Sequence, residues 1–176
     1  MIENINLGDK SKFVPYGANG VKNCLDLCKM ILKKYGLSNF GSSSGAIRLL
    51  CEENSKLVYY GDNPTANYKQ AIECIDRHLE NNRPIIVGVN HTIGRNINDG
   101  ATDHFVVIYG REYIDKYHIA YLYYEVGKSN VMYGYNDKDN RFIYDISKSK
   151  KPQFYDEISS RNDGARFDVT QVRPNY

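Results

Sequence analysis

The sequence predicts an α+β fold, with helices from the first half of the chain packed on an antiparallel sheet from the second half. Apolar residues recur at helical spacing before Arg83 and form runs of strand length after Pro84. Helices and strands do not alternate along the chain, so a parallel sheet built from βαβ units is not expected. A length of 176 residues suits one domain, residues 1–176.

Three helices are expected in the first half, at residues 24–35, 44–53 and 64–79. The first follows Asn23, a good N-cap, and ends before Gly36, which suits the position after a helix C-terminus. The second rests on apolar residues at helical spacing. The third has Asn63 as its cap, Pro64 at its first position and an apolar stripe along its length.

Five strands are expected in the second half, at residues 85–89, 104–109, 118–126, 141–145 and 167–172. A loop rich in glycine and asparagine, residues 92–102, joins the first two. In and beside it, the polar residues Asn90, Asn96, Asn98 and Asp99 suit either turn formation or hydrogen bonding to a bound peptide.

Composition excludes several classes of protein. Hydrophobic residues make up 41%, charged residues 25%, and the formal net charge is +2, as in ordinary soluble domains. Lys148, Lys150 and Lys151 suit a solvated loop, and no denser basic stripe indicates a nucleic-acid partner. No apolar run approaches the ~18 residues that a membrane span needs.

The N-terminal residues are polar and lack the apolar stretch of a signal peptide. The protein is therefore expected either in the cytoplasm or outside the cell after export without a cleaved signal. A piece of a longer protein would look the same, so the location stays open.

Among the four cysteines, position singles out Cys24 as a nucleophile. The cysteines form no Cys-x-x-Cys pair and have no histidine at zinc-finger spacing, so neither a structural zinc site nor a disulfide scaffold is expected. Cys24 follows the Asn23 cap, in the first helical turn, where free N–H groups and the helix dipole stabilise a thiolate. Cys28, Cys51 and Cys74 fall inside expected helices, where a cysteine usually behaves as a small buried hydrophobe.

His104 is the preferred general base among the four histidines. It begins an apolar strand directly after a polar loop, so a rigid element would hold it at the mouth of a cleft. His91, which follows the preceding strand, is the second choice. His78 is expected on the surface of its helix, and His118 is expected to be exposed at the start of a strand.

A third residue is needed to orient the imidazole and to stabilise its charged form. Glu125 is the only charged residue near the end of the strand that follows His104, and it is preferred. Asp103 and Asn136 are the alternatives. Asp103 adjoins His104, but neighbouring residues on a strand point to opposite faces.

These residues resemble the papain-like superfamily of cysteine peptidases and amidases. The resemblance rests on Asn23-Cys24 at a helix start, on the segment Asp103-His-Phe-Val-Val-Ile-Tyr-Gly110, and on a following strand that ends near Glu125. The order Cys, His, acid and the histidine segment are most similar to the bacterial branches, the CHAP-type amidases and bacteriocin-processing peptidases. The resemblance implies a papain-like version of the α+β fold.

The chain departs from the superfamily around the nucleophile. The signature Cys-Gly-Ser-Cys-Trp of plant papains is absent. Ala18 stands where that family has a glutamine that stabilises the oxyanion. The side chain of Asn19 is one substitute, since an amide can donate to an oxyanion, and a turn formed with Gly20 is the alternative interpretation.

The resemblance implies hydrolysis of peptide or other amide bonds through a thioester, without cofactor or metal. The implied partners are a peptide, protein or peptidoglycan substrate and, for a bacterial toxin or effector, a cognate inhibitor or immunity protein. Two alternatives remain open. One is an acyl-transfer or deamidating enzyme with the same triad, and the other is a non-catalytic peptide-binding module.

Overall fold

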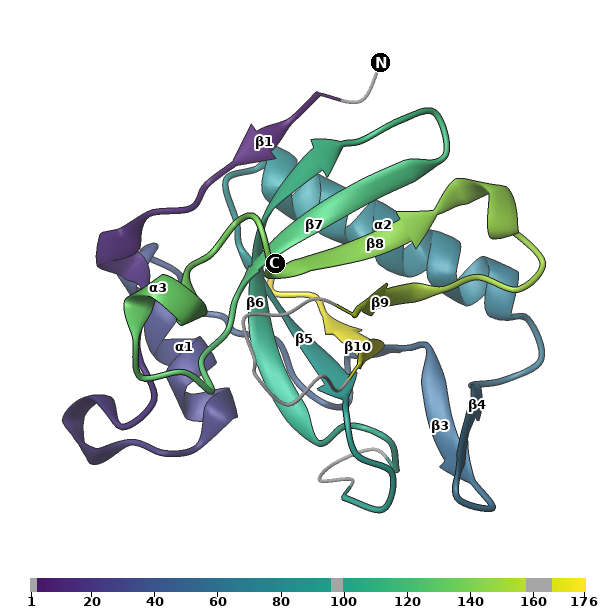
Figure 1. Ribbon diagram of the computed structural model, residues 1–176, viewed down its shortest axis with the longest axis horizontal. Coiled ribbons are helices and arrows are strands. Elements are labelled where there is room, and N and C mark those ends of the chain that lie inside the picture. Colours follow the sequence, from purple (N-terminus) through teal and green to yellow (C-terminus); the bar gives the residue numbers. More distant parts are fainter. Residues whose placement is uncertain (1–2, 96–99, 158–165) are drawn as a thin grey trace.

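The dominant feature of the structure is a closed antiparallel β-barrel (Figure 1). The computed structural model describes residues 3–95, 100–157 and 166–176. The barrel strands are β5 (Ile85–Asn90), β6 (His104–Tyr113), β7 (His118–Tyr124), β8 (Arg141–Asp145), β9 (Phe154–Asp156) and β10 (Phe167–Arg173). Their order around the barrel is β6-β5-β10-β9-β8-β7, and the pairing of β7 with β6 closes the ring.

Shorter elements surround the barrel. The strand β1 (Ile5–Asn6) pairs with β6, and β2 (Ile47–Arg48) pairs with β10. A separate hairpin is formed by β3 (Leu50–Glu53) and β4 (Lys56–Tyr59). The helices are α1 (Cys24–Lys34), α2 (Pro64–Glu80) and the single turn α3 (Val131–Gly134), and the 3-10 turns are η1 (Lys10–Lys12), η2 (Ala18–Gly20) and η3 (Ile146–Lys148).

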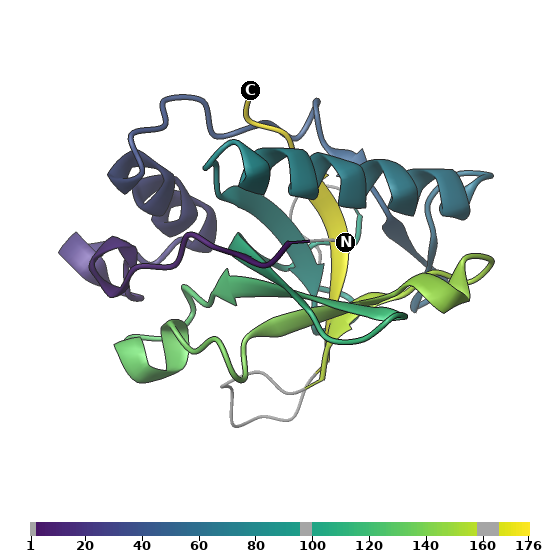
Figure 2. The same ribbon diagram turned by 90° about the horizontal axis from the view of Figure 1, so that it is seen from above.

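The predicted papain-like α+β fold, with N-terminal helices packed on a C-terminal sheet, is wrong. The described residues form mostly a closed six-stranded barrel, and their three helices lie around it (Figures 1 and 2). The expected strands are all present, but they do not form an open sheet. Because β6 pairs with β5 along one edge and with β7 along the other, the sheet curves until its two ends meet.

The predicted helix over residues 44–53 is also wrong, and that segment contains β2 and β3. Its apolar residues serve strand pairing, since Leu50 lies opposite Tyr59 and Cys51 opposite Val58. The hairpin turns at Asn54 and Ser55, whose φ angles of 49° and 61° are left-handed. Two consecutive left-handed residues are typical of the tight turns that join antiparallel strands.

The other two predicted helices are confirmed within one residue at each end. The side chain of Asn63 accepts a hydrogen bond from the N–H of Ala66 at 3.0 Å, and Pro64 occupies the first helical position of α2. No helix among the described residues is both long and apolar enough to cross a membrane.

Two apolar clusters hold the helices on the barrel. One contains residues from all six barrel strands, aromatic side chains such as Tyr123 and Phe142 among them, together with the apolar face of α2. The other joins the buried face of α1, including Leu27 and Ile31, to the opposite face of β5, β6 and β7. Strand alternation produces this division, because successive side chains point to opposite faces of the sheet. As a result, α1 and α2 occupy separate positions against the barrel (Figure 2).

His78 is fully buried on α2, so its predicted surface position is wrong. The C-terminal segment covers it, with the ring centroid of Tyr176 at 4.3 Å. Nε2 of His78 accepts a hydrogen bond from the N–H of Asn175 at 3.0 Å, and Nδ1 lies 2.8 Å from the carbonyl oxygen of Cys74. This arrangement requires a neutral ring with its proton on Nδ1.

Acid is expected to weaken the attachment of the C-terminal segment. Burial lowers the pKa of His78 in the folded protein, so below about pH 6.5 the unfolded chain binds more protons and the free energy of unfolding falls. Protonated Nε2 also cannot accept from Asn175. Urea unfolding at several pH values measures this effect. The free energy of unfolding is expected to fall less steeply in acid for His78→Gln than for the unmodified protein. His118→Gln, at a half-buried histidine, serves as control, and equal declines in the His78→Gln and unmodified proteins would contradict the prediction.

Candidate active site

Cys24 is the first residue of α1, as predicted from its cap. Asn23 has an extended backbone, and its side chain accepts a hydrogen bond from the N–H of Asp26 at 3.1 Å. The cap fixes the start of the helix, and Cys24 therefore lies in the first turn. The side chain is half-buried against the cluster under α1.

His104 and Glu125 form a close pair at one end of the barrel. Nε2 of His104 lies 2.5 Å from Oε1 of Glu125. His104 is the first residue of β6, and Glu125 follows the last residue of β7. The antiparallel register of these two strands, in which Val107 faces Tyr124, places both residues at the same end. Their side chains are only 13% and 1% exposed, so the pair is shielded from water.

Cys24 completes the group, because His104 lies close enough to lower the pKa of its thiol through hydrogen bonding and charge. Because Glu125 engages Nε2, the nitrogen left to exchange a proton with the sulfur is Nδ1. The backbone N–H groups of Leu25 and Phe105 also act to lower the pKa of the Cys24 thiol. The sequence therefore selected three residues that the fold brings into contact from α1, β6 and the end of β7.

Electrostatics in this group favour an ionised thiol. Burial acts to raise the pKa of Cys24, but the hydrogen bond and charge of His104, together with the two N–H groups, hold that pKa below the ordinary value. The thiolate and the imidazolium therefore stabilise each other.

The pKa of His104 is shifted in the opposite direction. Burial acts to lower the pKa of His104, but the negative charge of Glu125 and the hydrogen bonds with Cys24 and Glu125 outweigh it and raise the pKa to about 10. A lowered thiol pKa and a raised imidazole pKa define a pH range in which Cys24 is a thiolate and His104 an imidazolium. This charge state is the one that nucleophilic attack by sulfur requires.

Asp103 and Asn136, the two alternatives for the third residue, form hydrogen bonds with other groups. The carboxylate of Asp103 accepts hydrogen bonds from the N–H groups of His91 and Thr92, the latter at 2.8 Å. Asn136 forms a turn, in which its side chain donates to Asp139 at 3.0 Å and accepts from the N–H of Lys138 at 3.1 Å. Of the three candidates, Glu125 is the one placed on His104.

Asn19 lies in the 3-10 turn η2 before α1, with an exposed side chain and a left-handed φ of 51°. This backbone conformation agrees with the turn interpretation of Asn19-Gly20. Its role as an oxyanion donor stays a prediction. Asn90 is buried and donates to the carbonyl oxygen of Ala101 at 2.6 Å, so it serves the loop, whereas Asn96, Asn98 and Asp99 lie outside the described residues.

Phe167 borders the pair and was not predicted from the sequence. The ring of Phe167 packs with its centroid 5.6 Å from that of His104 and 5.5 Å from that of His91. His91, the second choice for the base, is therefore a neighbour of the site, with its ring centroid 6.4 Å from that of His104. Phe167 carried no sequence signal beyond strand propensity.

Gly127 is a second residue of the site that was not predicted from the sequence. Its N–H donates to Oε1 of Glu125 at 2.8 Å, which helps to fix the carboxylate. A Cβ atom at this position would lie 3.0 Å from Oε1 of Glu125 and 3.4 Å from Cε1 of His104. The close approach therefore leaves little room for any larger side chain.

Gly127→Ala is expected to slow the alkylation of Cys24 at pH 6 by about three- to tenfold, because the added methyl group displaces the Glu125–His104 pair. The rate is measured with iodoacetamide and mass spectrometry. Gly45→Ala is the matched control, since Gly45 is exposed and its Cβ would meet only the side chain of Ser42, at 3.3 Å. Equal rates in the two variants would contradict this role for Gly127.

The remaining cysteines lie in different surroundings. Cys28 is buried on the inner face of α1, and its burial raises the pKa well above the ordinary value. Burial also raises the pKa of Cys74. Cys51 lies in β3, where the sequence analysis had expected a helix. Of Cys24, Cys28 and Cys74, Cys24 is thus the one whose surroundings lower the thiol pKa.

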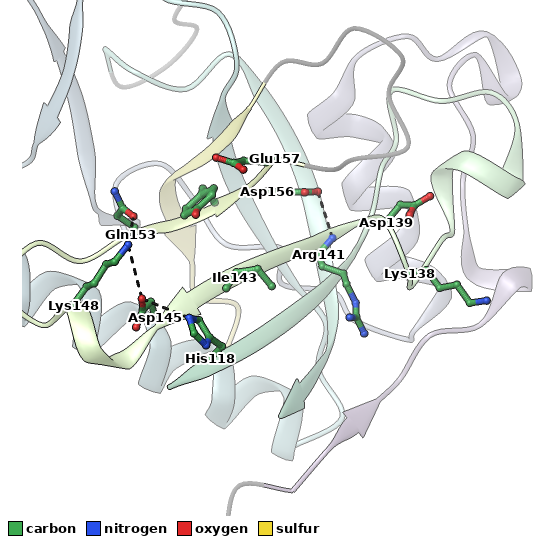
Figure 3. Close-up of a pocket in the computed structure, with 11 residues that line it drawn as sticks. His118, Lys138, Asp139, Arg141, Ile143, Asp145, Lys148, Gln153, Asp156 and Glu157 are labelled. Atoms are coloured by element: carbon green, nitrogen blue, oxygen red, sulfur yellow. Dashed lines mark hydrogen bonds and ion pairs between the residues drawn. The ribbon is translucent and has the colours of Figure 1, made fainter. Parts of the chain in front are cut away.

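A cavity of about 400 Å³ lies over β8 and β9, on a different part of the barrel (Figure 3). Ile143 and Tyr155 contribute apolar surface to it, and charged side chains of both signs surround them. Several of these charges already have partners, as Asp145 has with His118 and Lys148. None of Cys24, His104 and Glu125 lines this cavity.

Among the described residues, no group of three or more His, Cys, Asp or Glu side chains is arranged to hold a metal ion. Comparisons with models of protein families, with curated protein sequences and with solved structures find no match to this chain. The interpretation of the site therefore depends on its geometry and electrostatics.

Proposed function

We propose that the protein is a cysteine hydrolase that cleaves amide bonds through a thioester. The observation that carries this proposal is the contact chain from Cys24 to His104 to Glu125, in which the thiol pKa is lowered and the imidazole pKa is raised. A binding module has no need of a buried carboxylate on a histidine that contacts a thiol at a helix start. The chain order Cys, His, acid is that of the papain-like superfamily, although the fold does not enter the proposal.

Each residue has a defined step in this reaction. The Cys24 thiolate attacks the carbonyl carbon of the substrate, and the carbon–nitrogen bond breaks as His104 gives its Nδ1 proton to the leaving amine. His104, now neutral, takes a proton from water, and the resulting hydroxide attacks the thioester. The acid product leaves, and Cys24 returns to the thiolate while His104 is again protonated. Glu125 holds the ring and stabilises its charged form.

The first test is selective alkylation at pH 6 with iodoacetamide, followed by mapping of the labelled cysteines. An ordinary thiol with a pKa of about 8.5 reacts slowly at this pH, so rapid labelling confined to Cys24 is expected. Cys51→Ser is the matched control, because Cys51 is the other cysteine that is not fully buried. Slow and uniform labelling of all four cysteines would reject the proposal.

The substrate is sought by incubating the protein side by side with a denatured protein and with peptidoglycan fragments, using Cys24→Ala as the inactive control. Release of a new amine and a new carboxylate supports hydrolysis. Addition of a primary amine tests for acyl transfer, because an amine would then replace water in attacking the thioester. A protein that labels rapidly at Cys24 but retains peptides without turnover would instead be a binding module.

A further inference from the structure

One corner of the barrel, far from Cys24, carries exposed apolar and basic side chains together. We call it the tip surface, and it consists of Tyr113, Ile114, Lys116, Tyr117, Ile146, Lys148, Lys150 and Lys151. The hairpin between β6 and β7 and the turn η3 after β8 meet there, since the N–H of Ile146 donates to the carbonyl oxygen of Tyr117 at 2.8 Å. Both views show the two segments side by side (Figures 1 and 2).

The apolar side chains of the tip surface face water. Tyr113, Ile114, Tyr117 and Ile146 are between 40% and 45% exposed. A single exposed apolar side chain is ordinary, but four from two adjoining segments indicate a surface that contacts something apolar. Tyrosine also suits a boundary between water and lipid, because its ring is apolar and its hydroxyl is polar.

Positive charge accompanies this apolar surface. Lys116, Lys148, Lys150 and Lys151 are exposed, and Nζ of Lys116 lies 4.7 Å from the ring centroid of Tyr117. The two segments, residues 113–118 and 145–151, also contain two carboxylates, and both are engaged within the protein. Asp115 lies 2.9 Å from Nδ1 of His118, and Asp145 lies 3.6 Å from its Nε2 (Figure 3 shows the contacts of Asp145). Within these two segments, four lysines against two carboxylates leave a formal excess of +2.

We propose that the tip surface docks the protein on an anionic phospholipid bilayer. The apolar side chains would enter the interfacial region, and the lysines would contact the negatively charged headgroups. Neither feature suffices by itself, since lysines alone attract any polyanion and apolar side chains alone attract any apolar surface. Their combination at one exposed corner matches an anionic lipid surface better than an enclosed ligand.

The position of the tip surface leaves the candidate active site accessible. His104 begins β6 and Tyr113 ends it, and the strand has 10 residues, so the two ends lie about 30 Å apart at about 3.3 Å per residue. Docking through Tyr117 and its neighbours would therefore place Cys24 away from the lipid. This proposal does not depend on the proposed hydrolase activity, and it is tested without a substrate.

Vesicle sedimentation tests the proposal with the whole chain. The protein is expected to bind phosphatidylcholine vesicles that contain about one-third phosphatidylserine, and to bind less as salt is added. It is not expected to bind vesicles of phosphatidylcholine alone. Equal binding to both kinds of vesicle, no binding to either, or tighter binding to duplex DNA than to the anionic vesicles would overturn the proposal.

Variants of exposed residues separate the two contributions. A triple glutamine variant of the tip lysines is expected to bind anionic vesicles about 100-fold more weakly, and it consists of Lys148→Gln, Lys150→Gln and Lys151→Gln. Its control removes three exposed lysines elsewhere, and consists of Lys22→Gln, Lys56→Gln and Lys69→Gln. An equal loss in both variants would show that net charge alone drives binding and would overturn the proposal.

Ile114→Ser combined with Tyr117→Ser is expected to weaken binding about tenfold, because the apolar contact is lost. Met132→Ser with Tyr133→Ser is the control, since both residues are exposed on α3. The chain has no tryptophan, so Tyr117→Trp provides a single depth probe. Quenching of its fluorescence by brominated lipid is expected, and unquenched fluorescence on vesicle-bound protein would overturn the proposed orientation.

Discussion

His104→Ala is expected to slow the alkylation of Cys24 at pH 6 by at least tenfold. In the native protein the imidazolium of His104 stabilises the thiolate and holds the thiol pKa down. Without it, burial of the sulfur acts to raise the pKa and is opposed only by the N–H groups of Leu25 and Phe105. A thiol at the ordinary pKa of about 8.5 is ionised in only about one molecule in 300 at pH 6.

The pH dependence of the alkylation rate provides a second test of this prediction. Alkylation of the native protein should already be fast at pH 6, whereas the variant should reach a comparable rate only near the pKa of an ordinary or buried thiol. The control is His91→Ala, which removes the neighbouring histidine but leaves the contact of His104 with Glu125. If His91→Ala slows the reaction as much as His104→Ala does, the assignment of His104 as the base is wrong.

Glu125→Gln is expected to have the second large effect, by removing the charge that keeps His104 protonated. The amide keeps the size of the side chain and an oxygen that accepts from the N–H of Gly127. Burial then lowers the pKa of His104 without the negative charge of Glu125 to oppose it. The pKa of His104 is expected to fall from about 10 toward or below its ordinary value of about 6.5. Titration of the His104 Cε1–H signal by NMR measures this change directly.

Stability should change with pH in the direction that linkage requires. A raised pKa in the folded state stabilises the protein fully below about pH 6.5, and this stabilisation disappears as the pH rises through about 10. The loss caused by Glu125→Gln is therefore expected to be about 3 kcal/mol near pH 6 and to shrink toward pH 10. Urea unfolding at pH 6, 8 and about 10 measures it.

Glu73→Gln is the matched control for this substitution. Its carboxylate is exposed on α2 and lies 3.9 Å from Nζ of Lys69, so its removal is expected to change the free energy of unfolding by less than about 0.5 kcal/mol. A loss at Glu125→Gln that is equally large at pH 6 and pH 10 would mean that Glu125 supports the fold but does not hold a charged His104.

Local signals were sufficient for the elements that carry the candidate site. Asn23 and Asn63 mark the starts of α1 and α2 because a cap acts on N–H groups within three residues of itself. The apolar run after His104 was long enough to predict β6. From these elements alone, the nucleophile and the base could be selected before any contact between them was known.

Other elements were predicted wrongly because their sequence signals are short or fit a helix as well as a strand. The strands β2 and β3 have two and four residues, and their apolar spacing fits a helix equally well. The hairpin of β3 and β4 depends on left-handed angles at Asn54 and Ser55, and this pair is a weaker turn signal than Asn-Gly. His78 looked like a surface residue because the segment that buries it lies almost 100 positions further along the chain.

Local sequence signals are enough to predict where α1 begins, which cysteine lies in its first turn, and which strand His104 opens, since capping and periodicity act between near neighbours. The three-dimensional structure was needed to show that the sheet closes into a barrel, that Glu125 and not Asp103 contacts His104, and that His91 and Phe167 border the site. Those features depend on strand register and on burial between residues distant in the sequence, and such contacts leave no pattern in any local segment.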